Sequence, residues 1–227
     1  METRQFIWSL VIVSGLLALV GLIPRTQADQ PGSRAAVPAV ATFAGGCFWP
    51  QQEIFGELRG VQRVVAGYAG GAAAHPTYEQ VVQGGTGHAE TVQVYYNPQQ
   101  ISYQQLLNVF FFGSHNPTER NRQGPDTGRA VRSIAFYRNP QEQQLINATI
   151  KRANAEHRYA APIVTQVVPL RQFWPAEAYH QGYYTRHPKD GYIAQCSRPL
   201  VEHARQTFSG LLRPGAAKQL PVSVAAD

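Results

Sequence analysis

The sequence predicts a two-layer α/β sandwich with one mixed sheet and many loops. Short apolar runs with the alternation of strands take turns with longer runs of helical periodicity, an order typical of helices packed on a sheet. Some strands follow each other with no helix between them, which indicates a mixed sheet. The chain has 227 residues, of which 15% are charged, with 20 glycines and 16 prolines. This composition favours one compact domain rich in loops.

In the first half of the chain, predicted strands alternate with predicted helices. Strands are predicted over 39–43, 60–68 and 90–96, and helices over 48–58, 76–82 and 102–110. Pro50 fits the first turn of its helix, because proline has no N–H group to donate. Gly70-Gly71 and Asn97-Pro98 end strands. Ser102 is a helix cap.

The second half opens with a long polar loop over 115–129, rich in proline, glycine and arginine. Long loops in compact domains are more often functional than idle. Strands are then predicted over 131–137 and 163–168, and helices over 140–156, 175–184 and 199–212.

The N-terminus reads as a targeting segment. Arg4 precedes an uncharged apolar run over 6–23, and Thr26-Gln27-Ala28 has the small residues of a cleavage site. Residues 1–28 are therefore predicted to be a signal peptide, or a membrane anchor if they are not removed. Residues 29–37 form a linker, 38–212 the folded domain and 213–227 a flexible tail. An exported protein is expected, in the periplasm or anchored facing it.

The net charge of +6 comes from dispersed residues and not from a basic run. Nucleic-acid binding needs a concentrated basic patch, so none is expected. The histidines and the two cysteines lack the spacing of metal ligands, and no metal site is predicted. His88 and His180 are expected to orient neighbouring backbone or carboxylate groups.

Cys47 is the leading candidate for a reactive residue. It follows Gly45-Gly46 and comes directly before Phe48 and Trp49, at the start of a predicted helix. The free N–H groups and the positive end of the helix dipole favour a thiolate there, and the thiolate is the nucleophile. Two other readings stay open. Cys47 could be a small buried hydrophobe, or it could form a structural disulfide with Cys196, the second cysteine.

An ordered series of motifs resembles the A-type peptide methionine sulfoxide reductases. The matching motifs, which span about residues 41–192, are Gly46-Cys47-Phe48-Trp49, Gly67-Tyr68-Ala69-Gly70-Gly71, Pro76-Thr77-Tyr78, Gly87-His88-Ala89-Glu90, His115-Asn116-Pro117-Thr118, Asn121-Arg122-Gln123-Gly124, Arg132-Ser133 and Tyr179-His180-Gln181. The resemblance implies a ferredoxin-like sandwich, a catalytic domain over 38–212 and no bound cofactor. It implies reduction of methionine (S)-sulfoxide, free or in proteins, by a protein that is expected to be a monomer.

The resemblance also implies roles for single residues. Cys47 attacks the sulfoxide sulfur, and Glu90 protonates the sulfoxide oxygen. A sulfoxide oxygen leaves poorly until it is protonated, so the carboxyl group must keep its proton near neutral pH, which burial achieves. Substrate binding is implied for Phe48 and Trp49 at the methyl group, and for Tyr78 and Asp126 near the oxygen.

The cysteine is left as a sulfenic acid, which a second thiol converts to a disulfide. The resemblance implies that Cys196 resolves the sulfenic acid and that an external dithiol such as thioredoxin follows. Two departures bear on this expectation. Ile193 stands where many relatives carry the resolving cysteine, so Cys196 could be structural, with direct recycling of Cys47 by an outside reductant. Val131 stands where the family has a tyrosine, so one hydroxyl group near the substrate oxygen is missing.

Two other classes of function remain alternatives. A different cysteine enzyme, redox or acyl-transferring, would pair a histidine base with Cys47. A non-catalytic binding module would be held together by a disulfide between Cys47 and Cys196.

Overall fold

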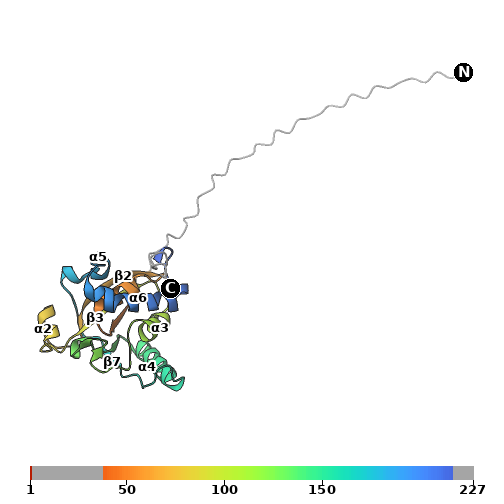
Figure 1. Ribbon diagram of the computed structural model, residues 1–227. Coiled ribbons are helices and arrows are strands. Elements are labelled where there is room, and N and C mark those ends of the chain that lie inside the picture. Colours follow the sequence, from red (N-terminus) through yellow and green to blue (C-terminus); the bar gives the residue numbers. More distant parts are fainter. Residues whose placement is uncertain (2–37, 217–227) are drawn as a thin grey trace, which may run out of the picture. The chain divides into compact units, whose positions relative to one another are not determined.

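The computed structural model describes Met1 and residues 38–216. Six strands form one sheet in the order β7-β6-β1-β3-β2-β8. Figure 1 labels three of them, β2, β3 and β7. Their bounds are β1 (Ala39–Ala44), β2 (Val61–Ala69), β3 (Ala89–Tyr96), β6 (Ile134–Tyr137), β7 (Gln166–Pro169) and β8 (Phe173–Pro175). A second, two-stranded sheet joins β4 (Arg122–Gln123) and β5 (Asp126–Thr127) inside the long polar loop.

The large sheet is mixed, as predicted. Strand β1 pairs antiparallel with β3 and β6, and β2 pairs antiparallel with β3 and β8. Only the pairing of β6 with β7 is parallel among these strands, and the helix α4 (Pro140–Ala155) makes that crossover. The register places Tyr68 opposite Glu90, so the end of β2 lies beside the start of β3.

Local signals explain where the helices begin. Helix α2 (Tyr78–Val82) and helix α3 (Tyr103–Gly113) start with capping boxes, Thr77 with Gln80 and Ser102 with Gln105. Helix α4 is capped by Asn139 and has proline at its first position. The remaining helical elements are α1 (Phe48–Gly56), α5 (Tyr183–Arg186), α6 (Arg198–Thr207), a π-helical turn (Ile193–Ser197) and 3₁₀ turns at Arg129–Val131, Ala178–His180 and Ser209–Leu211.

The main core lies between the sheet and the helices. Phe43 of β1 stacks on Phe55 of α1 and Phe110 of α3, with ring centroids 5.5 and 4.7 Å apart. Ile146 of α4 and Val201 of α6 belong to the same buried cluster. A smaller cluster, which includes Ala44, Ala69, Ala89, Ile134 and Phe136, completes the packing. This is the two-layer arrangement that the sequence predicts.

Several predicted elements differ from the structure, among them the strand predicted over 163–168, which spans Gln166–Pro169. The predicted helix over 175–184 is wrong, because Pro175 ends the edge strand β8 and Gly182 takes a left-handed conformation that interrupts the rest. The strand predicted to start at Val131 starts at Ile134, after a 3₁₀ turn. The last helix begins at Arg198, directly after the π-helical turn, and ends at Thr207.

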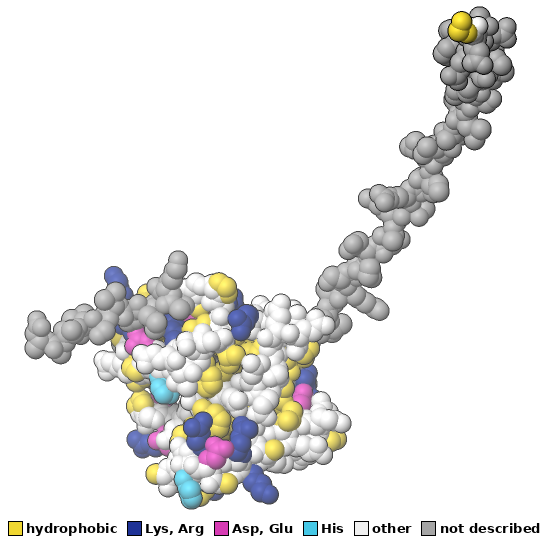
Figure 2. Space-filling view, turned by 90° about the vertical axis from the view of Figure 1, so that its right-hand side faces the viewer, with side chains coloured by type: hydrophobic (Ala, Val, Ile, Leu, Met, Phe, Trp, Pro, Cys, Tyr) yellow, Lys and Arg dark blue, Asp and Glu magenta, His cyan; other side chains and the backbone are white. Residues whose placement is uncertain are grey.

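The predicted signal segment, the linker and most of the predicted tail lie outside the described residues. Within residues 38–216, no helix is both long and apolar enough to cross a lipid bilayer. Figure 2 shows basic side chains spread over the face in view, several of them beside acidic ones.

Candidate active site

Strand β1 leads into helix α1 through the turn Gly45-Gly46-Cys47. Gly46 has a φ of +87°, and a Cβ atom on Gly45 would lie 2.8 Å from the ring of His115. Both positions therefore need glycine. Gly46 donates its N–H to the carbonyl of Val131 at 3.1 Å. Cys47 is the N-cap residue of α1, as its position in the sequence predicts, and its side chain is half-buried.

Glu90 reaches this turn from the start of strand β3. Its side chain is 5% exposed, and one of its carboxyl oxygens accepts the backbone N–H of Phe48 at 3.2 Å. Burial raises the pKa of Glu90 from its usual value of 4.5 to about 8, and the charge of Asp126 acts in the same direction. The N–H of Phe48 and the thiol of Cys47 oppose that rise, because both bind the carboxylate form.

The expectation of an ionised Cys47 is wrong, because its surroundings favour the neutral thiol. Burial raises the pKa of the thiol well above its usual value, and the negative charges of Glu90 and Asp126 raise it further. Hydrogen bonds to the backbone N–H of Trp49 and to Tyr192 lower the pKa, but by less. The helix terminus does favour the thiolate, as expected, yet burial next to two carboxyl groups outweighs it.

A cavity of about 340 Å³ opens over Cys47 and Glu90. Tyr78, the first residue of α2, lines it, and its backbone N–H donates to Glu177 at 2.9 Å. Burial and the nearby charge of Glu90 raise the pKa of Tyr78, so its hydroxyl stays a donor. Asp126 of β5 lines the same cavity. Four residues, two from strands β3 and β5 and two from the starts of helices α1 and α2, thus line one cavity.

Tyr192 is a site residue that sequence reasoning missed. Its hydroxyl donates to Asp126 and is also hydrogen-bonded to Cys47. The Gly191-Tyr192 pair is visible in the sequence, but nothing in it indicates that Tyr192 lies beside Cys47. Val131 lines the cavity, where the family's tyrosine would stand. Tyr192 therefore supplies a hydroxyl group in a site where Val131 supplies none.

The two aromatic residues after Cys47 have different positions. Trp49 lines the cavity, stacks on Tyr183 at 3.9 Å between ring centroids, and donates its indole N–H to Nδ1 of His180 at 3.1 Å. Phe48 is 1% exposed and packs behind the cavity, 4.9 Å from the ring of His180. His180 thus orients an indole ring, whereas the prediction for it named backbone or carboxylate groups. His88 does bind backbone, at Gly71 and Ala73.

Cys196 lies in the π-helical turn that precedes α6, and its side chain is half-buried. A second cavity of about 440 Å³ is lined by both Cys196 and Cys47, together with Gly46, Asp126 and Tyr192. The two cysteines are 149 positions apart in the sequence, and the fold places them around one space. The cavity gives the two sulfur atoms a shared space in which to meet.

Neither a binding module held together by a disulfide nor a cysteine enzyme with a histidine base fits this geometry. Cys47 and Cys196 are free thiols, so no disulfide between them holds the domain together. The side chains that act on the Cys47 sulfur are Glu90, Asp126 and Tyr192, and no histidine is among them. Within residues 38–216, no three His, Cys, Asp or Glu side chains gather as metal ligands do.

Comparisons with known proteins identify the family of the chain. The family model described as peptide methionine sulfoxide reductase matches residues 39–210. A protein of Thermus thermophilus named "Peptide methionine sulfoxide reductase MsrA" is 45% identical over 175 residues, which cover 77% of this chain and 98% of the relative. A protein of Acidobacterium capsulatum with the same name is 52% identical over 145 residues, covering 64% of this chain and 92% of the relative.

Two solved structures have a fold similar to that of this chain. Methionine sulfoxide reductase A of Corynebacterium diphtheriae superposes with a TM-score of 0.61 at 30% identity, covering 68% of this chain and 77% of that protein. Mxr1 of Saccharomyces cerevisiae in reduced form gives 0.62 at 30% identity, covering 69% and 89%. The chain therefore belongs to the A-type peptide methionine sulfoxide reductases and catalyses the thiol-dependent reduction of methionine (S)-sulfoxide, free or in proteins, to methionine.

Proposed function

We propose that Cys47 is the nucleophile of this reductase and Glu90 its general acid. The observation that carries the proposal is the shared cavity in which a thiol and a carboxyl group with a pKa of about 8 lie in contact. Near neutral pH the folded protein keeps the proton on Glu90. A protonated carboxyl group next to an attacking sulfur is what the reduction of a sulfoxide needs.

The first half of the reaction oxidises Cys47. Glu90 gives its proton to the sulfoxide oxygen while the Cys47 sulfur bonds to the sulfoxide sulfur, and the thiol proton passes to the carboxylate of Glu90. The hydroxyl group then moves to the Cys47 sulfur as the bond between the two sulfur atoms breaks. Methionine leaves, Cys47 becomes a sulfenic acid and Glu90 is again protonated, so no proton is consumed overall.

The remaining lining residues have binding roles in this proposal. The hydroxyl of Tyr78 donates to the substrate oxygen, and Asp126 acts near that oxygen, held in place by Tyr192. The indole of Trp49 forms the apolar wall for the substrate methyl group. Phe48 supports that wall from behind through His180, and its backbone N–H fixes the carboxyl group of Glu90.

The second half of the reaction uses Cys196. Its thiol attacks the sulfenic sulfur of Cys47, a disulfide forms and water leaves. The cavity that the two cysteines share supports this step. An external dithiol, thioredoxin or a similar protein, then reduces the disulfide and is itself oxidised. No bound cofactor takes part.

An assay with a chiral methyl sulfoxide tests these roles. With dithiothreitol the S epimer should be consumed and the R epimer left, and Cys47→Ser should abolish the loss of the S epimer. With thioredoxin as reductant, Cys196→Ser should reduce about one equivalent of sulfoxide per protein and then stop. Undiminished steady-state turnover of Cys196→Ser with thioredoxin would refute the resolving role, while activity of Cys47→Ser would refute the nucleophile.

We further propose that the protein acts outside the cytoplasm. The support is in the sequence, where Arg4, the apolar run over 6–23 and Thr26-Gln27-Ala28 follow the order of a signal peptide. Sequencing the N-terminus of the protein from a cell envelope fraction distinguishes the two forms. A mature chain that starts at Asp29 indicates cleavage, an intact Met1 in the membrane fraction indicates an anchor, and an intact Met1 in the cytoplasm contradicts export.

A further inference from the structure

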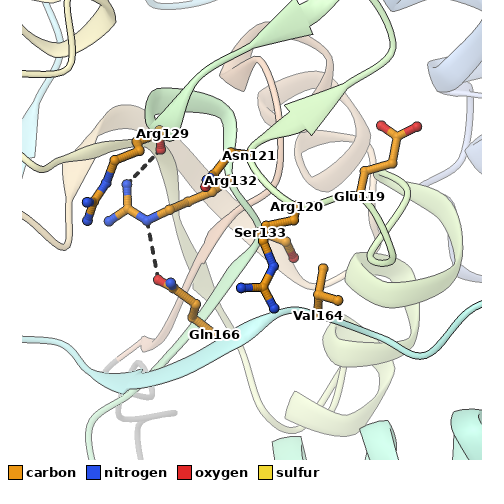
Figure 3. Close-up of a pocket in the computed structure, with 8 residues that line it drawn as sticks. All are labelled: Glu119, Arg120, Asn121, Arg129, Arg132, Ser133, Val164 and Gln166. Atoms are coloured by element: carbon orange, nitrogen blue, oxygen red, sulfur yellow. Dashed lines mark hydrogen bonds between the residues drawn. The ribbon is translucent and has the colours of Figure 1, made fainter.

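Two adjoining cavities lie on the other side of the 3₁₀ turn Arg129–Val131 from the catalytic cavity. Their volumes are about 240 and 680 Å³, and they share Arg129, Arg132 and Gln166. The smaller cavity is also lined by Arg120, Asn121, Ser133, Val164 and Glu119, as drawn in Figure 3. We call this smaller cavity the arginine cavity. The reaction described above does not use it.

Arg132 is a buried cation without a carboxylate partner. Arg132 is 5% exposed. Its five N–H groups donate to four backbone carbonyl oxygens and to the side-chain amide oxygen of Gln166. The carbonyls belong to Gly70, Gly87, His88 and Arg129. Neutral acceptors satisfy its hydrogen bonds but leave its charge uncompensated, which is costly in a buried position.

A second guanidinium group adds to this excess of positive charge. Burial and the nearby charge of Arg129 lower the pKa of Arg132 to about 10. Figure 3 draws the two guanidinium groups next to each other, with Arg120 on the far side of the cavity. No carboxylate of residues 38–216 forms an ion pair with any of the three arginines.

The one acidic residue of the lining does not neutralise these charges. The carboxylate of Glu119 accepts the backbone N–H of Gly124 at 3.2 Å, and in Figure 3 it points away from the three guanidinium groups. The amide oxygen of Gln166 faces Nε of Arg132 at 3.3 Å, which leaves the amide N–H₂ as a further donor. The arginine cavity therefore presents cations and hydrogen-bond donors.

We propose that the arginine cavity binds a tetrahedral oxyanion, such as inorganic phosphate or sulfate, from solution. All five N–H groups of Arg132 already donate to protein oxygens, so Arg132 contributes its charge to the site. The exposed guanidinium groups of Arg120 and Arg129 supply the parallel hydrogen bonds that match the paired oxygens of such anions. A volume of about 240 Å³ is that of roughly eight water molecules, so an oxyanion and a few waters fit. A bound anion would compensate the charges of Arg129 and Arg132.

The position of the arginine cavity would let a bound anion influence the catalytic cavity through the turn between them. Arg129 and Arg132 flank Ala130 and Val131, and these two residues line the catalytic cavity. Val131 also accepts the N–H of Gly46, the residue before Cys47. The anion would thus hold in place the turn that forms one wall of the catalytic cavity.

Thermal unfolding and calorimetric titration with sodium phosphate test the site in the full chain. The wild type should bind one phosphate and become more heat-stable with a saturable dependence. At about ten times the dissociation constant, the Tm should rise by roughly 3 to 6 °C over sodium chloride of equal ionic strength. Phosphate also stabilises proteins by exclusion from their surface, so variants must separate the two effects.

The variants Arg129→Gln and Arg120→Gln/Arg129→Gln change exposed positions and should fold. They should lose at least tenfold in phosphate affinity and most of the saturable rise in Tm. Lys151→Gln, which removes one exposed positive charge on α4, is the matched control and should behave as the wild type does. An equal response of all four proteins to phosphate, or the absence of binding heat in the wild type, would overturn the proposal.

Discussion

Replacing Glu90 with glutamine should make the folded protein more stable in mildly alkaline solution while it removes most of the activity. Glutamine has nearly the same shape as a protonated glutamate. Its amide oxygen can still accept the N–H of Phe48, which now binds the carboxyl group at 3.2 Å. The change therefore removes the ionisable proton and leaves the packing in place.

The magnitude follows from the two pKa values of Glu90, 4.5 in its usual surroundings and about 8 in the folded protein. Between these values the folded protein keeps a proton that the unfolded chain has released. Stability therefore falls as the pH rises through this window, and the loss is complete above pH 8. At about 1.4 kcal/mol for each pKa unit, the upper limit of the loss is about 5 kcal/mol.

Glutamine has no such loss, so the advantage of the variant should grow with pH. Urea unfolding of wild type and Glu90→Gln should give nearly equal free energies of unfolding at pH 4, below the usual pKa of the carboxyl group. At pH 8.5 the variant should be more stable by roughly 2 to 5 kcal/mol. Glu156→Gln, at a half-exposed carboxylate on the surface, is the control and should show no change in this difference with pH.

Activity should move in the opposite direction. Loss of a general acid costs about 10²- to 10⁴-fold in rate, so Glu90→Gln should be nearly inactive on the chiral sulfoxide. The kcat/KM of the wild type should fall as the pH rises through about 8, because Glu90 then loses its proton. A stability difference that stays constant from pH 4 to 8.5 would refute the reasoning, as would a variant with wild-type kcat/KM.

Two further substitutions test other contacts. Tyr192→Phe removes the hydroxyl that binds Asp126, and turnover with dithiothreitol should fall about 10- to 100-fold. Tyr95→Phe, whose hydroxyl binds a glutamine of its own strand, should keep the wild-type rate, and an equal rate for Tyr192→Phe would contradict the role. Arg205→Met leaves the buried Glu57, paired with Arg205 at 2.6 Å, without its cation. The variant should lose about 3 kcal/mol of stability in urea unfolding. Arg205→Met/Glu57→Gln should regain part of it, and a loss below about 1 kcal/mol would argue against the buried pair.

The sequence predicted those parts of the fold that short-range signals control. Alternating apolar residues mark β3, and the capping residue Ser102 marks the start of α3. Such signals act over a few residues and need no tertiary contact. The helix predicted over 175–184 failed because Pro175 pairs in the register of Gly67 at the edge of the sheet, a partner 108 positions away. Tyr179 and Tyr183 lie in two separate short helical turns on either side of Gly182.

The residues of the candidate site were likewise predicted only in part from the sequence. Cys47 was identified by its place at a predicted helix start, and the family resemblance implied Glu90, Tyr78 and Asp126. The structure brings all four to one cavity. Tyr192 was missed, because its hydroxyl meets Asp126 only when segments 66 positions apart fold together.

The sequence by itself determined which family the chain resembles and which residue types stand at the reaction centre. Only the tertiary structure decided their protonation. A helix N-terminus, visible in the sequence, favours a thiolate at Cys47, but burial and the charges of Glu90 and Asp126 raise its pKa. The same burial gives Glu90 its pKa of about 8. The reason is physical: the free energy of a charge depends on the solvent it has lost and on neighbours that are close in space, and neither can be read from the order of residues.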